Sequence, residues 1–367
     1  MRIFYAVPPS PNAFALRSSR LWDINLYQPL VDMGHDVVRF EADYFGLFLD
    51  AEATDSAGRA RHARRKAAFG RRLLEAVGKA HGDKPLDLFF SYFYSFFVDA
   101  DVIRRIGELG TVTANWYCNA SYQFDLVAEI APAYHFCWVP EKFRLADYRR
   151  VGANPLYCQE AANASYYRPL AVERRHDIVF VGQKYGNRPA FVRAMIDAGL
   201  EPRVFGPGWQ PMPPLPVVWR IPGVPRAAAR LARLVWRSRF YGLPLSDADY
   251  VAMLSRAKIS LGFTQVGDGT GAAAGIRQVR LRDFEAPMCG AFYLVERFDE
   301  LGEFFEPDKE IVFFEGGDEL VDKCRWYLAH ETERDRIRLA GMRRAREEHS
   351  WHNRYRQMFD RMGLARR

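Results

Sequence analysis

The sequence predicts an α/β protein with two doubly wound, Rossmann-like domains that face each other across a cleft. Strand-like apolar segments alternate with helix-like segments along most of the 367 residues, a pattern typical of parallel sheets covered by helices on both faces. The pattern restarts at 176–182, where a strand runs directly into a glycine. Two domains also suit this length, at roughly 100–200 residues each. We expect domains at 1–165 and 166–345, with 346–367 as a C-terminal helix returning to the first domain.

The first half is expected to begin with a short strand and then to alternate. Gly34-His35 marks a helix end followed by a strand start, and the apolar, aromatic stretch 86–93 is typical of a buried parallel strand. The expected strands are 2–6, 37–41, 86–93, 111–116, 134–139 and 155–159. The expected helices are 20–33, 59–78, 99–109 and 141–151.

The second half repeats this order. Its expected strands are 176–182, 202–206, 258–263, 292–295 and 311–314. Its expected helices are 187–198, 247–256, one that carries Glu285, and a run of helices after 318. Residues 210–245 are rich in proline and arginine and are interpreted as an insertion.

The distribution of charge and the spacing of the cysteines bear on membrane insertion, disulfides and zinc binding. The net charge of +7 comes from two segments, 59–72 with seven cations and 226–239 with five, neither of which holds an acid. No stretch of about 18 uncharged apolar residues exists, so we expect no transmembrane helix. The five cysteines form no CxxC pair, which favours reduced thiols in a cytoplasmic protein and gives no zinc site.

The most informative segment is a glycine-rich run, 267–275, followed by a helix that carries Arg282 and Glu285. A loop and a helix N-terminus offer backbone N–H groups to phosphate. Arginine adds a forked cation, and a carboxylate accepts hydrogen bonds from ribose hydroxyls. These are the parts of a nucleotide-diphosphate site. The alternative is an ordinary loop entering a core helix, with Glu285 paired to Arg282.

Further donor-binding candidates follow the carboxyl ends of strands, where ligands bind in such sheets. They are Gly182, Lys184, Arg188 and Gly206, with Thr270 and Gly271 in the glycine-rich run. The two strand-end glycines are expected to let the backbone approach a ligand or a neighbouring element. The alternative is that they serve plain turns.

Six motifs of the second half, in order, resemble the GT-B glycosyltransferases of the CgeB-like, spore-maturation group. They are Phe180–Arg188, Val204–Trp209, Arg282–Ala291, Phe304–Ile311, Tyr327–His330 and Glu348–Arg354. The first half resembles the group more loosely, at Asn115-Trp116, the strand 134–140 and the crossover-like segment 159–169. The resemblance implies a GT-B fold, with a glycosyl transferase group 1 domain that holds a nucleotide-diphosphate sugar and an N-terminal domain that holds the acceptor.

The chain departs from the pattern of these enzymes at two positions. Related retaining enzymes carry two glutamates separated by seven residues; Glu285 matches the second, but Arg277 stands where the first would be. Many relatives have an arginine directly after the strand glycine, where this chain has Gln183.

The predicted function is transfer of a sugar from a nucleotide-diphosphate sugar to a hydroxyl of a glycan, lipid-linked saccharide, protein or metabolite. No cofactor or metal is expected, because the Asp-x-Asp sequences at 99–101 and 247–249 are interpreted as helix starts. One alternative is a non-catalytic nucleotide-sugar-binding protein, favoured by Arg277 and Gln183. Others are a GT-B-type sugar-nucleotide epimerase and a nicotinamide dehydrogenase, the latter disfavoured because no GxGxxG follows the first strand.

The catalytic group is not identified by the sequence. The candidates are Asp23, Asn119 and His135, with Arg20 and Asp125 as further residues for acceptor contact. His135 lies in an apolar stretch, and a packed core histidine is the favoured alternative for it.

Segment 225–239 spaces four arginines as one face of a helix. Such a basic amphipathic helix suits peripheral contact with an anionic membrane, here its cytoplasmic face. The alternative is a helix packed on its own domain with a solvated arginine face. Nucleic acid is not an expected partner, since the chain holds no binding motif for it.

Overall fold

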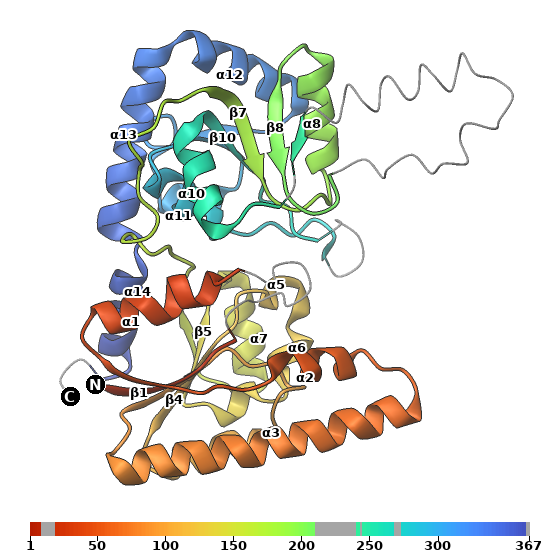
Figure 1. Ribbon diagram of the computed structural model, residues 1–367, viewed down its shortest axis with the longest axis vertical. Helices are drawn as coiled ribbons and strands as arrows, with labels where there is room; N and C mark the ends of the chain where they lie inside the picture. The colour runs from red at the N-terminus through yellow and green to blue at the C-terminus, as the bar shows by residue number, and fades with distance from the viewer. Residues whose placement is uncertain (9–18, 210–239, 243, 268–272, 365–367) are drawn as a thin grey trace, which may run out of the picture. The chain divides into compact units, whose positions relative to one another are not determined.

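The computed structural model describes residues 1–8, 19–209, 240–242, 244–267 and 273–364 (Figure 1). The chain forms two compact units. The N-terminal unit comprises Met1–Tyr166 with Glu348–Arg367, and the C-terminal unit comprises Tyr167–Glu347. Each holds a six-stranded sheet in which every strand pair is parallel. The prediction of an α/β protein with two doubly wound sheets is confirmed.

The sheet of the N-terminal unit has the order β2-β1-β3-β4-β5-β6. Its strands are β1 (Arg2–Ala6), β2 (Asp36–Arg39), β3 (Leu88–Ser91), β4 (Val112–Trp116), β5 (Phe136–Val139) and β6 (Pro155–Tyr157). The central strand β3 is buried along its whole length, as parallel strands covered on both faces are. It is shorter than the predicted strand 86–93, because the chain leaves the sheet after Ser91 and continues as a buried aromatic loop.

Helices surround this sheet. They are η1 (Asp23–Tyr27), α1 (Gln28–Asp32), α2 (Tyr44–Ala51), α3 (Ser56–Asp83), α4 (Ala100–Gly107), α5 (Ala120–Gln123), α6 (Asp125–Ala128), η2 (Ala131–Ala133), η3 (Lys142–Arg144), α7 (Leu145–Arg150) and α14 (Trp351–Arg361). Helix α3, the long orange helix of Figure 1, confirms the predicted basic helix. Asp55 caps it, and it buries Phe69, Leu73 and Val77 at four-residue spacing. Helices α2, α5 and α6 were not predicted, because all three are short.

The last helix, α14, belongs to the N-terminal unit. The hydroxyl of Tyr355 donates a hydrogen bond to the Leu26 carbonyl at 2.8 Å, and the Trp351 ring meets that of Trp116 edge-on at 4.9 Å. These buried aromatic contacts fasten the end of the chain to its beginning.

The sheet of the C-terminal unit has the order β12-β11-β10-β7-β8-β9. Its strands are β7 (His176–Val181), β8 (Pro202–Phe205), β9 (Tyr241–Gly242), β10 (Ala257–Gly262), β11 (Phe292–Glu296) and β12 (Val312–Phe314). Strand β9 lies within the stretch that was expected to be an insertion; its two residues are too few to leave a pattern in the sequence.

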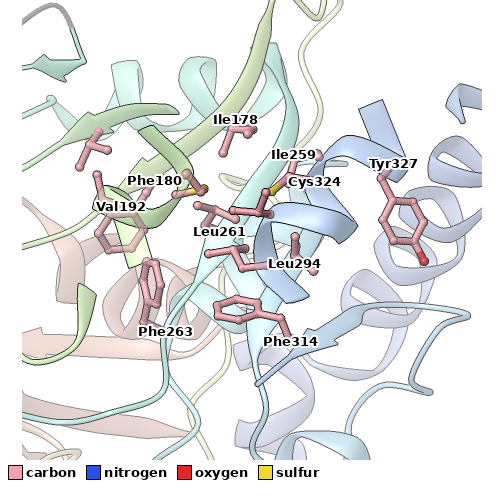
Figure 2. Close-up of a cluster of buried hydrophobic side chains, with 14 of the residues drawn as sticks. Ile178, Phe180, Val192, Ile259, Leu261, Phe263, Leu294, Phe314, Cys324 and Tyr327 are labelled. Carbon is pink, nitrogen blue, oxygen red and sulfur yellow. The ribbon is translucent and has the colours of Figure 1, made fainter. Parts of the chain in front are cut away.

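The helices of this unit are α8 (Arg188–Asp197), α10 (Asp247–Arg256), α11 (Arg282–Met288), η6 (Asp299–Glu303), α12 (Gly317–Ala329) and α13 (Glu331–Glu348). Figure 2 shows the core beside α8 and α12, where Phe180, Phe263 and Phe314 gather. The Phe180 and Phe263 rings meet edge-on at 4.8 Å. This packing fixes the carboxyl ends of β7 and β10, from which the candidate site is built.

Three further expectations concern the cysteines, membrane-spanning helices and segment 225–239. All five cysteines are buried and free, which confirms the expectation of unpaired thiols. In the described ranges, no helix is long and apolar enough to cross a membrane. The arginine-bearing segment 225–239 lies outside the described residues.

Candidate functional site

The candidate site lies at the carboxyl ends of β7 and β8 in the C-terminal unit. Hydrogen bonds tie the two loops that leave these strands. Gly182 N donates to Phe205 O at 2.8 Å, and Lys184 N donates to Pro207 O at 3.0 Å. The Trp209 indole N–H donates to Gly182 O at 2.7 Å. The loops therefore form one rigid surface at the sheet edge.

The two predicted glycines make this contact possible. Gly206 has φ +136°, and a Cβ there would collide with the carbonyl of Gly182. A Cβ at Gly182 would lie 2.7 Å from the Phe180 ring and 3.2 Å from a guanidinium nitrogen of Arg282. Both positions thus require glycine for close approach of neighbouring parts of the chain, one of the alternatives that the sequence left open.

Three guanidinium groups converge beside these loops. We call Arg188, Arg280 and Arg282 the arginine cluster. Arg188, which is 3% exposed, lies over the Tyr185 ring at 3.8 Å from its centroid. The Arg280 guanidinium lies over the same Tyr185 ring, 5.9 Å from its centroid. The Arg282 guanidinium lies over the Phe180 ring, 5.4 Å from its centroid. The two aromatic rings stabilise these cations by cation–π interactions.

None of the three forms a salt bridge with a carboxylate within the described part of the chain. Each also has a buried Nε atom without a hydrogen-bond acceptor. Arg188 donates to Gln183 O at 2.8 Å and to the Tyr185 hydroxyl at 2.6 Å, and Arg280 donates to Gln265 O. Buried charges are usually paired, so a cluster of unpaired cations is suited to an anionic ligand.

Burial and neighbouring charges shift the pKa values of the arginine cluster. Burial lowers the pKa of Arg188 to about 9, and the positive charges of Arg280 and Arg282 act in the same direction. Burial also opposes the charge of Arg282, but the neighbouring Tyr250 and the acid Glu285 raise its pKa above the ordinary value. The salt bridge between Arg282 and Glu285, which was the alternative to a binding site, does not form within 4.0 Å.

Several backbone N–H groups at the start of α11 already have acceptors within the chain. Arg280 N donates to the Asp283 carboxylate at 2.7 Å, Asp283 N to Arg280 O, and Glu285 N to Leu281 O. The helix has only seven residues. The side chains of Arg280 and Arg282 also make this segment positive, and phosphate binding by its backbone stays a prediction.

Glu285 is buried at 4% exposure against two tyrosines. The Tyr250 hydroxyl donates to its Oε2 at 2.8 Å, while its Oε1 has no hydrogen-bond donor in bonding geometry. Burial raises the pKa of Glu285, and hydrogen bonding by Tyr167 and the charge of Arg282 offset this in part. One carboxylate oxygen thus remains to accept a ligand hydroxyl, as the prediction for this residue requires.

The resemblance places Arg277 where related retaining enzymes have a glutamate. In this structure Arg277 forms an ion pair with Glu296. Its guanidinium lies 3.2 Å from Glu296, which is 1% exposed at its side chain. Glu296 also accepts hydrogen bonds from the Asn187 amide at 2.7 Å and Thr264 N at 3.0 Å. This carboxylate therefore braces the loops that follow β7 and β10 around the candidate site.

Two predicted donor-binding residues, Thr270 and Gly271, lie outside the described residues. Lys184 is exposed beside Gly208, at the loop after β7 where it was expected. Arg280 was not predicted. Its spacing of two residues from Arg282 on a loop entering a helix was the available signal.

The catalytic candidates of the N-terminal unit have different surroundings. Asp23 is buried and paired with Arg39 at 2.7 Å and Arg20 at 3.2 Å. Asn119 precedes α5 after the carboxyl end of β4, and Asp125 is exposed at the start of α6.

His135 is neither in a strand nor buried, so the expectation of a packed core histidine was wrong. It is exposed and precedes β5. Its Nδ1 accepts a hydrogen bond from Thr113 N at 3.1 Å, near the start of β4. Because this is the amino end of the strands, His135 lies at the opposite edge from the ligand-binding edge, and we withdraw it as a catalytic candidate.

Comparison with known proteins agrees with this arrangement. Residues 188–360 match a family model described as "Glycosyl transferase-like". No protein in the curated set that was searched matches the sequence.

Solved structures with the same fold span essentially the whole chain. Sucrose-phosphate synthase from Thermosynechococcus elongatus is 13% identical, with a TM-score of 0.59 and 100% of both chains covered. HepE of Anabaena, solved with UDP and glucose, is 10% identical, with a TM-score of 0.61 and 99% of each chain covered. A glycosyltransferase from Rickettsia africae is 9% identical, with a TM-score of 0.61 and coverage of 100% of this chain and 98% of its own. At these identities the likeness shows the fold, which is GT-B.

Residues 188–360 thus match a glycosyl transferase-like domain, and the chain has the GT-B fold.

Proposed function

We propose that the C-terminal unit binds a nucleoside-diphosphate sugar and that the protein transfers the sugar to an acceptor hydroxyl. The observation that carries this proposal is the arginine cluster: three guanidiniums at one sheet edge without a carboxylate partner among the described residues. A diphosphate supplies the missing negative charge and the acceptors for the buried Nε atoms. Glu285 accepts from a ribose hydroxyl through its open oxygen.

The same residues suit the chemical step. When the bond between the sugar and the phosphate breaks, negative charge develops on the departing nucleoside diphosphate. Fixed cations next to that oxygen stabilise the charge as it forms. We propose that the arginine cluster has this role and that transfer is independent of added metal. Transfer that persists in EDTA supports the second part, and loss of transfer with recovery on adding Mg²⁺ or Mn²⁺ contradicts it.

Isothermal titration with UDP, GDP, ADP, dTDP and CDP tests donor binding directly. HepE was solved with UDP, so UDP is the first ligand to titrate. We expect Arg188→Met and Arg280→Met each to weaken binding ~10- to 100-fold, the effect of losing a hydrogen bond to a charged group. Arg193→Met is the matched control, because Arg193 is exposed on the same helix as Arg188. Unchanged affinity in both cluster variants would contradict the proposal.

A second candidate function is nucleotide-sugar binding without turnover. Arg277 favours it, since a cation held by Glu296 stands where retaining relatives have a glutamate. Donor hydrolysis or transfer in a panel of nucleotide sugars excludes this candidate, whereas tight binding without any product supports it.

We further propose that the chain belongs to the CgeB-like group. We also propose that segment 225–239 contacts anionic membranes. The four-three-four spacing of Arg226, Arg230, Arg233 and Arg237 supports this contact. Sedimentation with phosphatidylglycerol vesicles tests it: replacing these arginines by alanine should abolish binding. Replacing Arg64 and Arg71, two exposed cations of α3, is the control for general basicity and should leave binding intact.

A further inference from the structure

The Tyr185 side chain adjoins every member of the arginine cluster. Its ring centroid lies 3.8 Å from the guanidinium of Arg188 and 5.9 Å from that of Arg280. Its phenol also helps to raise the pKa of Arg282, so it is near the third cation as well. Tyr185, Arg280 and Arg282 are all partly exposed. A ligand that reaches this part of the cluster therefore meets the tyrosine together with the cations.

The loop that carries Tyr185 is fixed on both sides of this residue. Before it, Lys184 N donates to Pro207 O at 3.0 Å. After it, Gly186 has φ +57°, and a Cβ there would lie only 3.2 Å from Gly267 O. This glycine lets the loop pack closely against the loop that follows β10. Because the tyrosine is already held in place, a ligand that binds it has little ordering entropy to overcome.

The Tyr185 hydroxyl has an unused hydrogen. The hydroxyl oxygen accepts a hydrogen bond from a guanidinium nitrogen of Arg188 at 2.6 Å, and this bond is only partly buried. Arginine can only donate, so the hydrogen of the hydroxyl is directed elsewhere, and no acceptor takes it within the described part of the chain. A hydroxyl that accepts from a cation becomes a stronger donor, because linked hydrogen bonds polarise one another. The geometry therefore leaves a strong donor beside three cations.

We propose that the Tyr185 hydroxyl donates a hydrogen bond to the diphosphate of the bound nucleotide, as a fourth contact beside the arginine cluster. This inference rests on the proposed function, since the ligand is the same. An O–H group that donates to an anionic oxygen forms a shorter and stronger bond than one between neutral groups. The ring has a separate role, because it stabilises Arg188 and Arg280 by cation–π interactions. The two roles can be removed separately by substitution.

The test compares Tyr185→Phe with wild type by isothermal titration with the nucleoside diphosphate that binds most tightly. Phenylalanine keeps the ring and removes the hydroxyl. We expect Tyr185→Phe to bind ~10-fold more weakly, as for loss of a hydrogen bond to a charged group, with an unchanged melting temperature. Unchanged affinity overturns the inference.

Tyr327→Phe is the matched control, because it removes a phenolic hydroxyl from the same unit. Tyr327 lies on α12, and its ring centroid is 4.4 Å from that of Phe292. Phe292 is the first residue of β11, so this contact is at the opposite edge of the sheet from the candidate site. Tyr327→Phe should bind the nucleotide as wild type does, and a loss equal to that of Tyr185→Phe would contradict a specific contact.

A double variant separates direct contact from an effect that acts through Arg188. If the hydroxyl only orients Arg188, removing it from Arg188→Met costs no further affinity, whereas a hydroxyl that touches the diphosphate still costs affinity in that background. We expect Tyr185→Phe combined with Arg188→Met to bind at least ~3-fold more weakly than Arg188→Met alone. Thermal melts in excess ligand extend the comparison to weak binding. If Tyr185→Phe lowers the melting temperature, this comparison decides, and equal affinity of the two variants overturns the inference.

A third variant, Tyr185→Leu, removes the ring together with the hydroxyl and should bind more weakly than Tyr185→Phe. Weak binding by Tyr185→Leu with normal binding by Tyr185→Phe means that only the ring matters, which overturns the hydroxyl contact. Nucleotide binding that Arg188→Met and Arg280→Met weaken, but Tyr185→Phe does not, overturns this inference and leaves the proposed function standing. A wild type that binds no nucleoside diphosphate overturns both.

Discussion

The guanidinium of Arg277 and the carboxylate of Glu296 lie 3.2 Å apart at the base of the glycine-rich run. Arg277 is 42% exposed at its side chain, whereas Glu296 is buried. The acid also accepts from Asn187 and from Thr264. Glu296, the last residue of β11, thus holds Arg277 in place. The resemblance matches the position of Arg277 to a glutamate of related retaining enzymes.

Because the two partners differ in burial, their removal should differ in cost. Glu296→Ala leaves Thr264 N and the Asn187 amide without an acceptor, so we expect a loss of about 2–4 kcal/mol in the free energy of unfolding. Arg277→Ala removes a half-exposed partner and should cost under about 1 kcal/mol. Urea denaturation of both variants checks this order. Equal losses would mean that the ion pair, rather than the hydrogen bonds, stabilises the loops.

The arginine cluster should reduce the stability of the protein without ligand. Arg188→Met removes a buried cation beside two others and keeps most of its volume, so the melting temperature without nucleotide should stay unchanged or rise. The stabilisation on adding excess nucleoside diphosphate should shrink, because stabilisation follows affinity. Thermal melts with and without UDP measure both effects. A lower melting temperature together with full stabilisation by UDP is the result that the cluster cannot explain.

The acid Glu285 should make stability depend on pH. Burial raises its pKa in the folded protein, so the folded state binds the proton more tightly than the unfolded state. Its contribution is fully present below the unfolded pKa of about 4.3 and is lost as pH rises through the folded pKa, at about 1.4 kcal/mol per pH unit between the two. Glu285→Gln should therefore gain stability relative to wild type as pH rises from about 4. Urea denaturation at a series of pH values tests this, and a constant difference between the two proteins would contradict it.

Gly206 should tolerate no side chain. Gly206→Ala places a methyl group against the Gly182 carbonyl and strains a backbone with φ +136°, so we expect a loss above about 2 kcal/mol and weaker nucleotide binding. Gly34→Ala is the control. Its φ of +79° is also positive but lies nearer the left-handed helical region, and a Cβ there meets nothing within 4 Å, so about 1 kcal/mol is expected. Equal losses would show that the contact with Gly182 is unimportant.

Local sequence patterns were enough to predict the two parallel sheets, the strand-glycine junction at Gly182 and the helix that carries Arg282 and Glu285. These follow from local patterns: apolar runs that end at a glycine, and small residues that stop a helix. The shift of His135 from an expected strand to the exposed turn before β5 shows the limit of such patterns, because one polar residue at a strand end does not reveal on which side of the boundary it lies.

Which distant residues come together depends on the pairing of the strands. Arg188 and Arg280 are far apart in the chain. They come together because β7 and β10 are parallel neighbours in the sheet, so the carboxyl ends of both strands lie at the same edge. Parallel pairing of distant segments creates this site, and no local spacing in the sequence encodes which distant loops will share an edge.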